Sequence, residues 1–214
     1  MTLLVAASLW STPRDRLDAE AARLAAAGLR RWHWDASDGV LAAPGGFDVA
    51  TAARLMGRTG LPGEAHLMVA DPLAHVDDWA DVCETVVVHA EARGWQEAVD
   101  RVRGRGRRPG VAVAPATPPA VLDDLPGDVA VLVMSIVPGR AGAAFEPATL
   151  ARLDALAGRP ALGVDGGVTL DRARDCAAHG ATWVVSGSAL CGSADPAAWL
   201  TAAQGRWTAA NVSD

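Results

Sequence analysis

The sequence predicts an α/β protein in which eight strand–helix units close into a (β/α)8 barrel. Short apolar runs alternate with segments whose apolar residues recur every three or four positions, as in amphipathic helices. Residues 129–134 are apolar throughout, as expected of a parallel strand buried on both faces. No glycine-rich dinucleotide fingerprint follows the first apolar run, which disfavours an open doubly wound sheet. The length of 214 residues fits one barrel domain over residues 1–214.

The expected elements follow from the positions of these patterns. Eight apolar runs are the expected strands: residues 3–9, 31–35, 64–69, 85–89, 110–114, 129–135, 161–165 and 182–186. The segments with the clearest helical period are residues 14–27, 49–56, 95–102, 150–156 and 170–178. Gly28 and Gly180 each follow a helical segment, and Thr169 precedes one, as expected of helix ends.

The composition excludes several classes of protein. The formal charge of −6 argues against nucleic acid as a partner, because proteins that bind it present a surplus of basic residues. No apolar run reaches the length of about 18 residues that a membrane-spanning helix needs, so we expect no membrane partner. The first five residues have no basic flank or cleavage pattern of a signal peptide. With three widely spaced cysteines, which fit a reducing compartment, this predicts a cytoplasmic protein.

Two residue types are missing, and their absence limits the chemistry. All 19 basic residues are arginine, and the sequence contains no tyrosine. A Schiff-base mechanism, a lysine acid and a tyrosine acid are therefore excluded. Proton transfer is left to aspartate, glutamate, histidine and cysteine. We expect the thiols of Cys83, Cys176 and Cys191 to be inert, because their neighbours in the sequence are apolar.

Polar residues gather at the predicted carboxyl ends of the strands, where barrel enzymes place their active sites. His33 and Asp35 are two positions apart, so their side chains share one face of a strand, here the barrel interior. His66 on the next strand can reach the same point, and Asp165 can approach it from across the barrel. Two imidazoles and two carboxylates at one point predict a site for one divalent metal ion of the zinc, iron, manganese or cobalt type.

Two glycine turns give a second signal. Gly166-Gly167 and Gly187-Ser188 follow consecutive predicted strands, and the first turn leads into the helix that Thr169 caps. In barrels of this type, backbone N–H groups of the last two strand–helix loops commonly hold a phosphate. The pair of turns therefore predicts a phosphate site.

Several short motifs, in order along the chain, resemble those of a known family. They are Ala7-Ser8-Leu9, His33-x-Asp35-x-x-Asp38-Gly39, His66-Leu67-Met68-Val69, His89-Ala90-Glu91, Ala116-Thr117-Pro118, Met134-Ser135 with Pro138-Gly139, Val164-Asp165-Gly166-Gly167 and Gly187-Ser188-Ala189-Leu190. Over nearly its whole length the sequence resembles the ribulose-phosphate 3-epimerases, isomerases with a TIM barrel of the ribulose-phosphate-binding type. The resemblance implies inversion of C3 in a ketose phosphate, D-ribulose 5-phosphate to D-xylulose 5-phosphate, in pentose phosphate metabolism.

The resemblance also implies roles for individual residues. It assigns the metal to His33, Asp35, His66 and Asp165, and the acid/base chemistry to Asp35 and Asp165. On this hypothesis one carboxylate removes the C3 proton to give an enediolate, and the other returns a proton to the opposite face. The residues expected to contact the sugar phosphate are Ser8, His66, Met68, Gly139, Arg140, Ala141, Gly142, Asp165, Gly166, Gly167, Gly187 and Ser188. The family further implies a homo-oligomer.

The sequence departs from the family pattern around the expected substrate. Ser37 stands where methionine is usual, and Val137 stands where asparagine is usual before a proline. Residues 40–44 replace a His-Phe-Val-Pro-Asn pattern, and Arg140-Ala141-Gly142-Ala143 replaces a Phe-Gly-Gly-Gln lid. Because the expected metal residues are intact, these departures leave open which sugar phosphate is bound.

Three alternatives to the leading function remain. The same chemistry could act on a hexulose phosphate or on a sugar of a specialised pathway. A metal-dependent aldol cleavage is a second alternative; the related barrel family that uses an active-site lysine is disfavoured because the sequence contains no lysine. A catalytically inactive barrel that serves as a binding module is the third. The role of His89, packing or support of the metal site, is also open.

Overall fold

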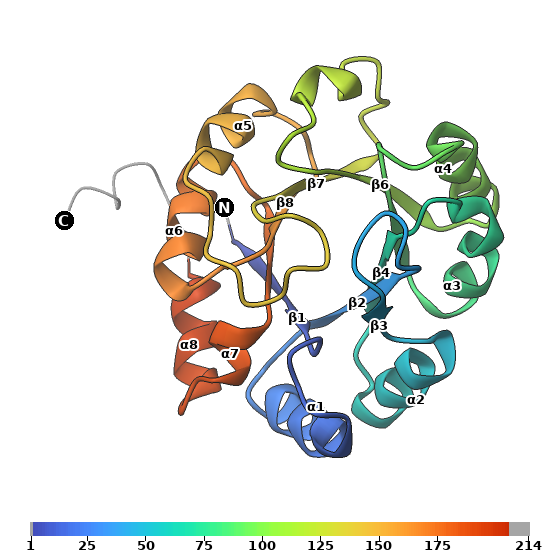
Figure 1. Ribbon diagram of the computed structural model, residues 1–214. Coiled ribbons are helices and arrows are strands. Elements are labelled where there is room, and N and C mark those ends of the chain that lie inside the picture. Colours follow the sequence, from blue (N-terminus) through green and yellow to red (C-terminus); the bar gives the residue numbers. More distant parts are fainter. Residues whose placement is uncertain (1, 206–214) are drawn as a thin grey trace.

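The described part of the chain is a closed barrel of eight parallel strands surrounded by helices (Figure 1). A computed structural model describes residues 2–205. The expected single domain spans residues 1–214, of which residue 1 and residues 206–214 lie outside the described residues. The barrel strands are β1 (Leu4–Ser8), β2 (Arg31–Ser37), β4 (Gly63–Met68), β5 (Thr85–His89), β6 (Arg108–Val113), β7 (Ala130–Met134), β8 (Leu162–Asp165) and β9 (Trp183–Ser186). Their order is β1-β9-β8-β7-β6-β5-β4-β2, and pairing of β1 with β2 closes the ring. The expected (β/α)8 fold is confirmed.

Helices and short 3-10 turns connect the strands on the outside of the barrel. The α-helices are α1 (Leu17–Ala26), α2 (Val49–Thr59), α3 (Val76–Val82), α4 (Trp95–Gly104), α5 (Thr149–Ala155), α6 (Leu170–Ala178), α7 (Ser188–Cys191) and α8 (Pro196–Ala203). The 3-10 turns are η1 (Arg14–Arg16), η2 (Pro72–Ala74) and η3 (Pro119–Leu122). The expected cap at Thr169 is present, because its side chain accepts a hydrogen bond from the N–H of Arg172.

Two local expectations are wrong, and one short strand was not anticipated. The connection from β6 to β7 contains the 3-10 turn η3 in place of an α-helix, because Pro126 and Gly127 interrupt the segment soon after it begins at Pro119. Residues 14–16 likewise form η1 rather than the first turn of α1. The short strand β3 (Gly45–Gly46), antiparallel to the end of β2, was not expected because two glycines carry no apolar alternation.

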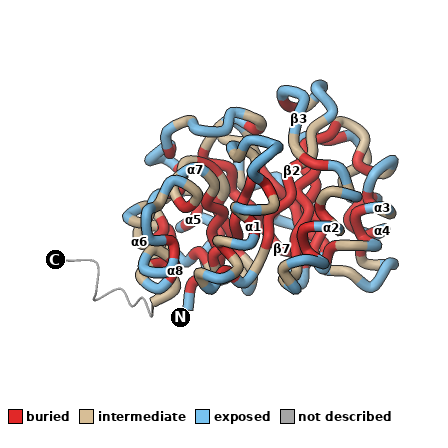
Figure 2. Tube along the Cα trace, turned by 90° about the horizontal axis from the view of Figure 1, so that it is seen from below, coloured by how far each residue is buried: buried red, intermediate tan, exposed pale blue. Residues whose placement is uncertain are grey.

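Side chains alternate along each barrel strand between the interior and the surrounding helices. Trp32 and Trp34 face the helices: both are fully buried, and the Trp32 indole donates to Thr59 Oγ1 in α2 at 3.0 Å. A separate apolar cluster fills the interior of the barrel: Ala6, Val87, Ala112, Ala130, Leu132, Met134, Trp183 and Val185. Figure 2 shows the buried strands at the centre and the exposed residues on the outer sides of the helices. The polar residues of the interior must therefore find partners among themselves.

None of the helices within residues 2–205 combines the length and the apolar character that crossing a membrane would require.

The packing of Trp183 inside the barrel gives a stability prediction. A Cβ added at Gly163 would overlap the indole of Trp183, so we expect Gly163→Ala to lower the free energy of unfolding by roughly 1–3 kcal/mol. Gly57 in α2 is the matched control, because a Cβ there meets no atom within 4 Å. Gly57→Ala should raise the free energy of unfolding by about 0.5–1 kcal/mol. Urea denaturation measures both changes, and equal stability of the two variants would contradict the packing described.

Candidate functional site

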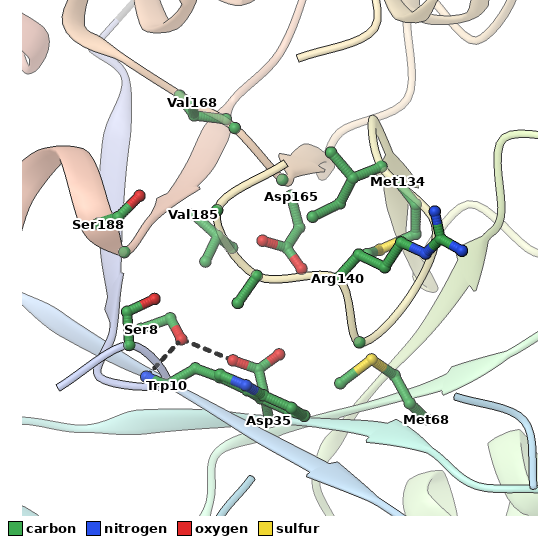
Figure 3. A pocket seen from close by; sticks show the side chains of 18 residues that line it. Ser8, Trp10, Asp35, Met68, Met134, Arg140, Asp165, Val168, Val185 and Ser188 are labelled. Atoms are coloured by element: carbon green, nitrogen blue, oxygen red, sulfur yellow. Dashed lines mark hydrogen bonds between the residues drawn. The ribbon is translucent and has the colours of Figure 1, made fainter. Parts of the chain in front are cut away.

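A pocket opens at the carboxyl ends of the barrel strands (Figure 3). Asp35 at the end of β2 and Asp165 at the end of β8 enter it from opposite sides. Its wall is completed by Ser8, Trp10, Ser11, Met68, Met134, Ile136, Gly139, Arg140, Ala141, Gly142, Gly166, Gly167, Val168, Val185, Gly187 and Ser188. The pocket therefore lies where barrel enzymes carry out their chemistry.

The four residues expected to bind a metal meet at one point in the floor of this pocket. One donor atom of each, from His33, Asp35, His66 and Asp165, lies within 4.8 Å of all the others. His66 Nδ1 is 3.1 Å from Asp35 Oδ1 and 3.6 Å from Asp165 Oδ2. His33 Nε2 is 3.2 Å from Asp35 Oδ1 and 3.9 Å from Asp165 Oδ2. Both imidazoles are fully buried, so they have no contact with solvent.

Strand geometry explains why these side chains converge. His33 and Asp35 are alternate residues of β2, and the register of the sheet places Asp35 beside His66 of β4. On the other side of the barrel, Asp165 lies at the last position of β8, beside Met134 of β7. Since alternate residues of parallel strands point into the barrel at the same levels, the register alone brings these groups together.

The electrostatics of the cluster shift the pKa values of the two carboxyl groups in opposite directions. Burial alone would raise the pKa of Asp35, but the imidazoles of His33 and His66 bring that pKa below its ordinary value. Burial and the charge of Asp35 raise the pKa of Asp165 to about 7, although His33 acts in the opposite direction. Two carboxyl groups whose pKa values are separated in this way are suited to opposite roles in proton transfer.

The imidazoles also differ from each other. Burial disfavours a charged His33, yet the carboxylates of Asp35 and Glu64 hold the pKa of His33 well above its usual value. Burial and the neighbouring His33 lower the pKa of His66. The cluster thus combines two nitrogen and two oxygen donors, buried and within reach of one cation, a donor set that fits zinc, iron, manganese or cobalt.

Two contacts of the interior lie beyond what the sequence analysis predicted. Glu64, which was not among the expected site residues, is only 1% exposed and lies 2.8 Å from His33 Nδ1 through its Oε1 atom. His89, whose role was open, lies 2.9 Å from His66 Nε2 and contacts Glu91 on its other side. The signal for Glu64 was present, because it precedes His66 by two residues and therefore shares its face of the strand.

Most of the residues expected to contact substrate line the pocket. His66 does not, because it lies in the floor with no exposed surface. Trp10 and Ser11 line the wall although the sequence analysis did not include them. Ser8 also supports the site directly, since its hydroxyl donates to Asp35 Oδ2 at 2.6 Å.

The segments that depart from the family pattern lie at the mouth of the pocket or close to it. Arg140 is exposed on the loop between β7 and α5, and its guanidinium has no hydrogen bond or ion pair among the described residues. Ser37 is absent from the pocket wall, and its hydroxyl donates to the carbonyl of Ala42. Asp38 holds the same loop by accepting from the backbone N–H groups of Val40 and Ala70.

The three cysteines are absent from the pocket wall. Burial raises the pKa of the Cys83 and Cys176 thiols to about 12, and that of Cys191 to about 11. Since the thiolate is the reactive form, these values agree with the expected inert thiols.

The fold and the buried acid–base groups at the strand ends define the chain as a barrel enzyme. Its residues 4–191 match the model of the family described as "Ribulose-phosphate 3 epimerase family". The chain therefore belongs to the ribulose-phosphate 3-epimerase family, a family of isomerases, and the resemblance seen in the motifs is confirmed.

Relatives with curated names are similar over most of their length. A protein named ribulose-phosphate 3-epimerase, cytoplasmic isoform, from Oryza sativa subsp. japonica is 31% identical over 209 residues, covering 92% of this chain and 91% of the relative. A ribulose-phosphate 3-epimerase from Mycobacterium bovis is 32% identical over 219 residues, covering 98% of this chain and 95% of the relative. A 3-hexulose-6-phosphate synthase from Salmonella typhimurium superposes with a TM-score of 0.69 over 95% of this chain and 97% of that structure, at 17% identity, which supports the fold alone.

Proposed function

We propose that this protein is a metal-dependent epimerase that inverts C3 of a ketose phosphate, converting D-ribulose 5-phosphate to D-xylulose 5-phosphate. One observation carries the proposal: Asp35 and Asp165 face each other across a pocket, and one ring nitrogen each of His33 and His66 lies within 4.8 Å of their carboxylate oxygens. The names of the relatives support the choice of substrate.

The two aspartates perform the proton transfers. The C3 proton is weakly acidic because it lies beside the ketone, so its removal needs a base in contact and stabilisation of the resulting enediolate. Asp35 takes the proton from one face of the planar enediolate, and Asp165 gives a proton to the other face; the roles exchange in the reverse reaction. Carboxyl groups on opposite sides of one pocket suit inversion, since a single group would return the proton to the face from which it came.

His33, Asp35, His66 and Asp165 are the residues that would hold the metal. A divalent cation at this point would supply positive charge that stabilises the enediolate oxygens, an effect worth several kcal/mol. Two carboxylates in the donor set balance the cation's charge within the buried floor. The side chains come from strands of a closed barrel, so their positions are fixed before the substrate arrives.

The phosphate of the substrate would lie at the glycine turns. Gly166-Gly167 and Gly187-Ser188 line the same wall and present backbone close to the pocket. Both Gly166 and Gly167 have positive φ, and an added Cβ would overlap the side chain of Ile136 at Gly166 and the backbone of residues 143–145 at Gly167, so side chains are disfavoured there. Ser8 and Met68 line the same pocket and would border the sugar, Ser8 on the side of Ser188 and Met68 on the side of Arg140.

A second candidate substrate is a ketose with acidic groups at both ends. In Figure 3, Arg140 and Ser188 lie on opposite sides of the two aspartates, so a sugar with its phosphate at Ser188 extends toward Arg140. The Arg140 guanidinium is without a partner among residues 2–205 and could pair with a second anionic group. The chemistry at C3 would be unchanged.

We also propose that one domain over residues 1–214 is the catalytic unit. We expect it to act in the cytoplasm, because its three cysteines form no disulfide. The resemblance to the family suggests a homo-oligomer.

Replacement of either aspartate tests the acid/base assignment. Asp35→Asn and Asp165→Asn should each lower kcat by about 100- to 10,000-fold, because each removes one proton-transfer group. Asp35→Asn should also abolish incorporation of solvent deuterium at C3, measured by NMR on ribulose 5-phosphate. Asp171→Asn on the exposed surface of α6 is the control and should leave both rates unchanged. Deuterium incorporation at the wild-type rate in Asp35→Asn would place the base elsewhere.

Removal and return of metal tests whether activity depends on a divalent ion. Protein treated with a chelator should be inactive and should regain activity with Zn²⁺, Mn²⁺, Fe²⁺ or Co²⁺. Metal at 100 times its dissociation constant should also stabilise the fold by about 2.7 kcal/mol, seen as a higher melting temperature. His66→Ala should lose this shift, whereas His179→Ala, which alters a histidine paired with Asp154 on the surface, should keep it. Full activity of the metal-free protein would contradict the proposal.

Arg140→Ala distinguishes the two candidate substrates. If the substrate is acidic at both ends, Arg140→Ala should raise the KM for D-ribulose 1,5-bisphosphate roughly tenfold, because the loss of one charge-assisted hydrogen bond weakens binding by about that factor. The KM for D-ribulose 5-phosphate should change little. Arg93→Ala is the control, because Arg93 is 80% exposed and pairs with Asp71. An equal rise for both sugars would mean that Arg140 binds the 5-phosphate, and no change for either would exclude Arg140 from binding.

A further inference from the structure

The outer nitrogen of each histidine in the metal cluster is linked to a carboxylate, directly for His33 and through His89 for His66. His33 Nδ1 lies 2.8 Å from Glu64 Oε1. His66 Nε2 lies 2.9 Å from His89 Nε2, and His89 Nδ1 lies 2.9 Å from Glu91 Oε2. The three imidazoles are buried, so water cannot supply alternative hydrogen bonds to these nitrogens.

The hydrogen bonds that link Glu91, His89 and His66 run in one direction when Glu91 is ionised. An ionised carboxylate can only accept hydrogen bonds, and Glu91 already accepts one from the N–H of Ala114 at 2.9 Å. His89 must therefore donate from Nδ1 to Glu91. A neutral imidazole has one proton, so Nε2 of His89 accepts, and His66 must donate to it from its own Nε2. This leaves a lone pair on Nδ1 of His66, the atom that faces the metal cluster. In the absence of metal that lone pair accepts from His33 Nε2, 3.2 Å away, which also lies 3.2 Å from Asp35 Oδ1.

The geometry of the two rings agrees with this hydrogen bond. The planes of His66 and His89 are inclined by 21° and their centroids are 5.0 Å apart, as expected of imidazoles that meet edge to edge. The N–H of one ring then lies along the lone pair of the other.

Glu64 acts on His33 in the same way, but through the other nitrogen. Its Oε1 accepts from Nδ1 of His33, so Nε2 is the nitrogen directed at the cluster. Its second oxygen, Oε2, is 3.5 Å from the guanidinium of Arg31. The two histidines thus present different nitrogens to the same point, and each choice is made by a carboxylate outside the cluster.

We propose that Glu64, and Glu91 acting through His89, are positioning residues: each accepts the outer N–H of one histidine, directly or through His89, so that Nε2 of His33 and Nδ1 of His66 are the nitrogens directed at the metal. This inference rests on the proposed metal site. It adds three residues, Glu64, His89 and Glu91, to those on which metal affinity depends.

Glu91→Gln is the sharpest test because it reverses the direction of the hydrogen bonds through His89 to His66 while the side chain keeps its shape. The amide oxygen of the introduced glutamine would keep the hydrogen bond from Ala114, and its NH₂ group would then face His89 Nδ1 as a donor. His89 would have to move its proton to Nε2 and donate to His66, whose proton would shift to Nδ1. The nitrogen facing the cluster would then be blocked. Glu91 suits this test because its side chain is 26% exposed, so the variant should fold.

Two measurements separate this proposal from the proposed function. Long-range ¹H–¹⁵N NMR of histidine-labelled, metal-free protein reports which ring nitrogens carry protons. We expect the proton on Nε2 of His66 and on Nδ1 of His89 in the wild type, and the reverse in Glu91→Gln. Competition with a chelator for Zn²⁺ should show affinity about 10- to 100-fold lower in Glu91→Gln. Glu97→Gln, the same change at an exposed position of α4, is the control and should match the wild type in both measurements.

The outcomes are distinguishable. A proton on Nδ1 of His66 in the wild type, or wild-type tautomers and Zn²⁺ affinity in Glu91→Gln, would overturn the proposal. Glu64→Gln should weaken Zn²⁺ binding by a similar factor, and wild-type affinity in that variant would remove Glu64 from the proposal. If the wild type binds no Zn²⁺, the proposed metal site fails. The tautomers of the metal-free protein still decide whether Glu91 sets the direction of the hydrogen bonds through His89 to His66.

Discussion

Burial of four ionisable side chains around one point is the constraint on which this structure depends. His33, Asp35, His66 and Asp165 have little access to solvent, so each must be balanced by the others, by further polar groups or by a cation. Strand register brings them together, since parallel strands in a closed barrel place alternate side chains at common levels. The fold thus fixes both the site and its electrostatic requirement.

The same requirement extends the polar network beyond the four residues. An apolar interior at this level would leave the outer nitrogens of His33 and His66 without partners, at a cost of several kcal/mol. Glu64 and the pair His89–Glu91 meet this need from β4, from β5 and from the residues that follow β5. Elsewhere the interior is filled by an apolar cluster, with Leu132 and Trp183 among its largest members.

Rigid and variable parts of the site divide between strands and loops. The cluster residues lie on strands, where a change would disturb packing on both faces of the sheet. Arg140 and the residues around it lie on a loop, where a new side chain alters the pocket wall without disturbing the barrel. This division explains how a chain can belong to the ribulose-phosphate 3-epimerase family and still differ from the family pattern at the mouth of its pocket.

The sequence by itself determined the barrel, its eight strands and the convergence of His33, Asp35, His66 and Asp165, because an apolar period and a two-residue spacing are local properties that specify a strand and its face. Tertiary structure decided which atoms meet: Nε2 of His33 but Nδ1 of His66, the contact of Glu64 with His33, and the place of Trp10 in the pocket wall. It also decided that η3 replaces a helix after β6. Spacing assigns a side chain to a face, whereas ring orientation and partners depend on register, closure and the packing of segments distant in the chain.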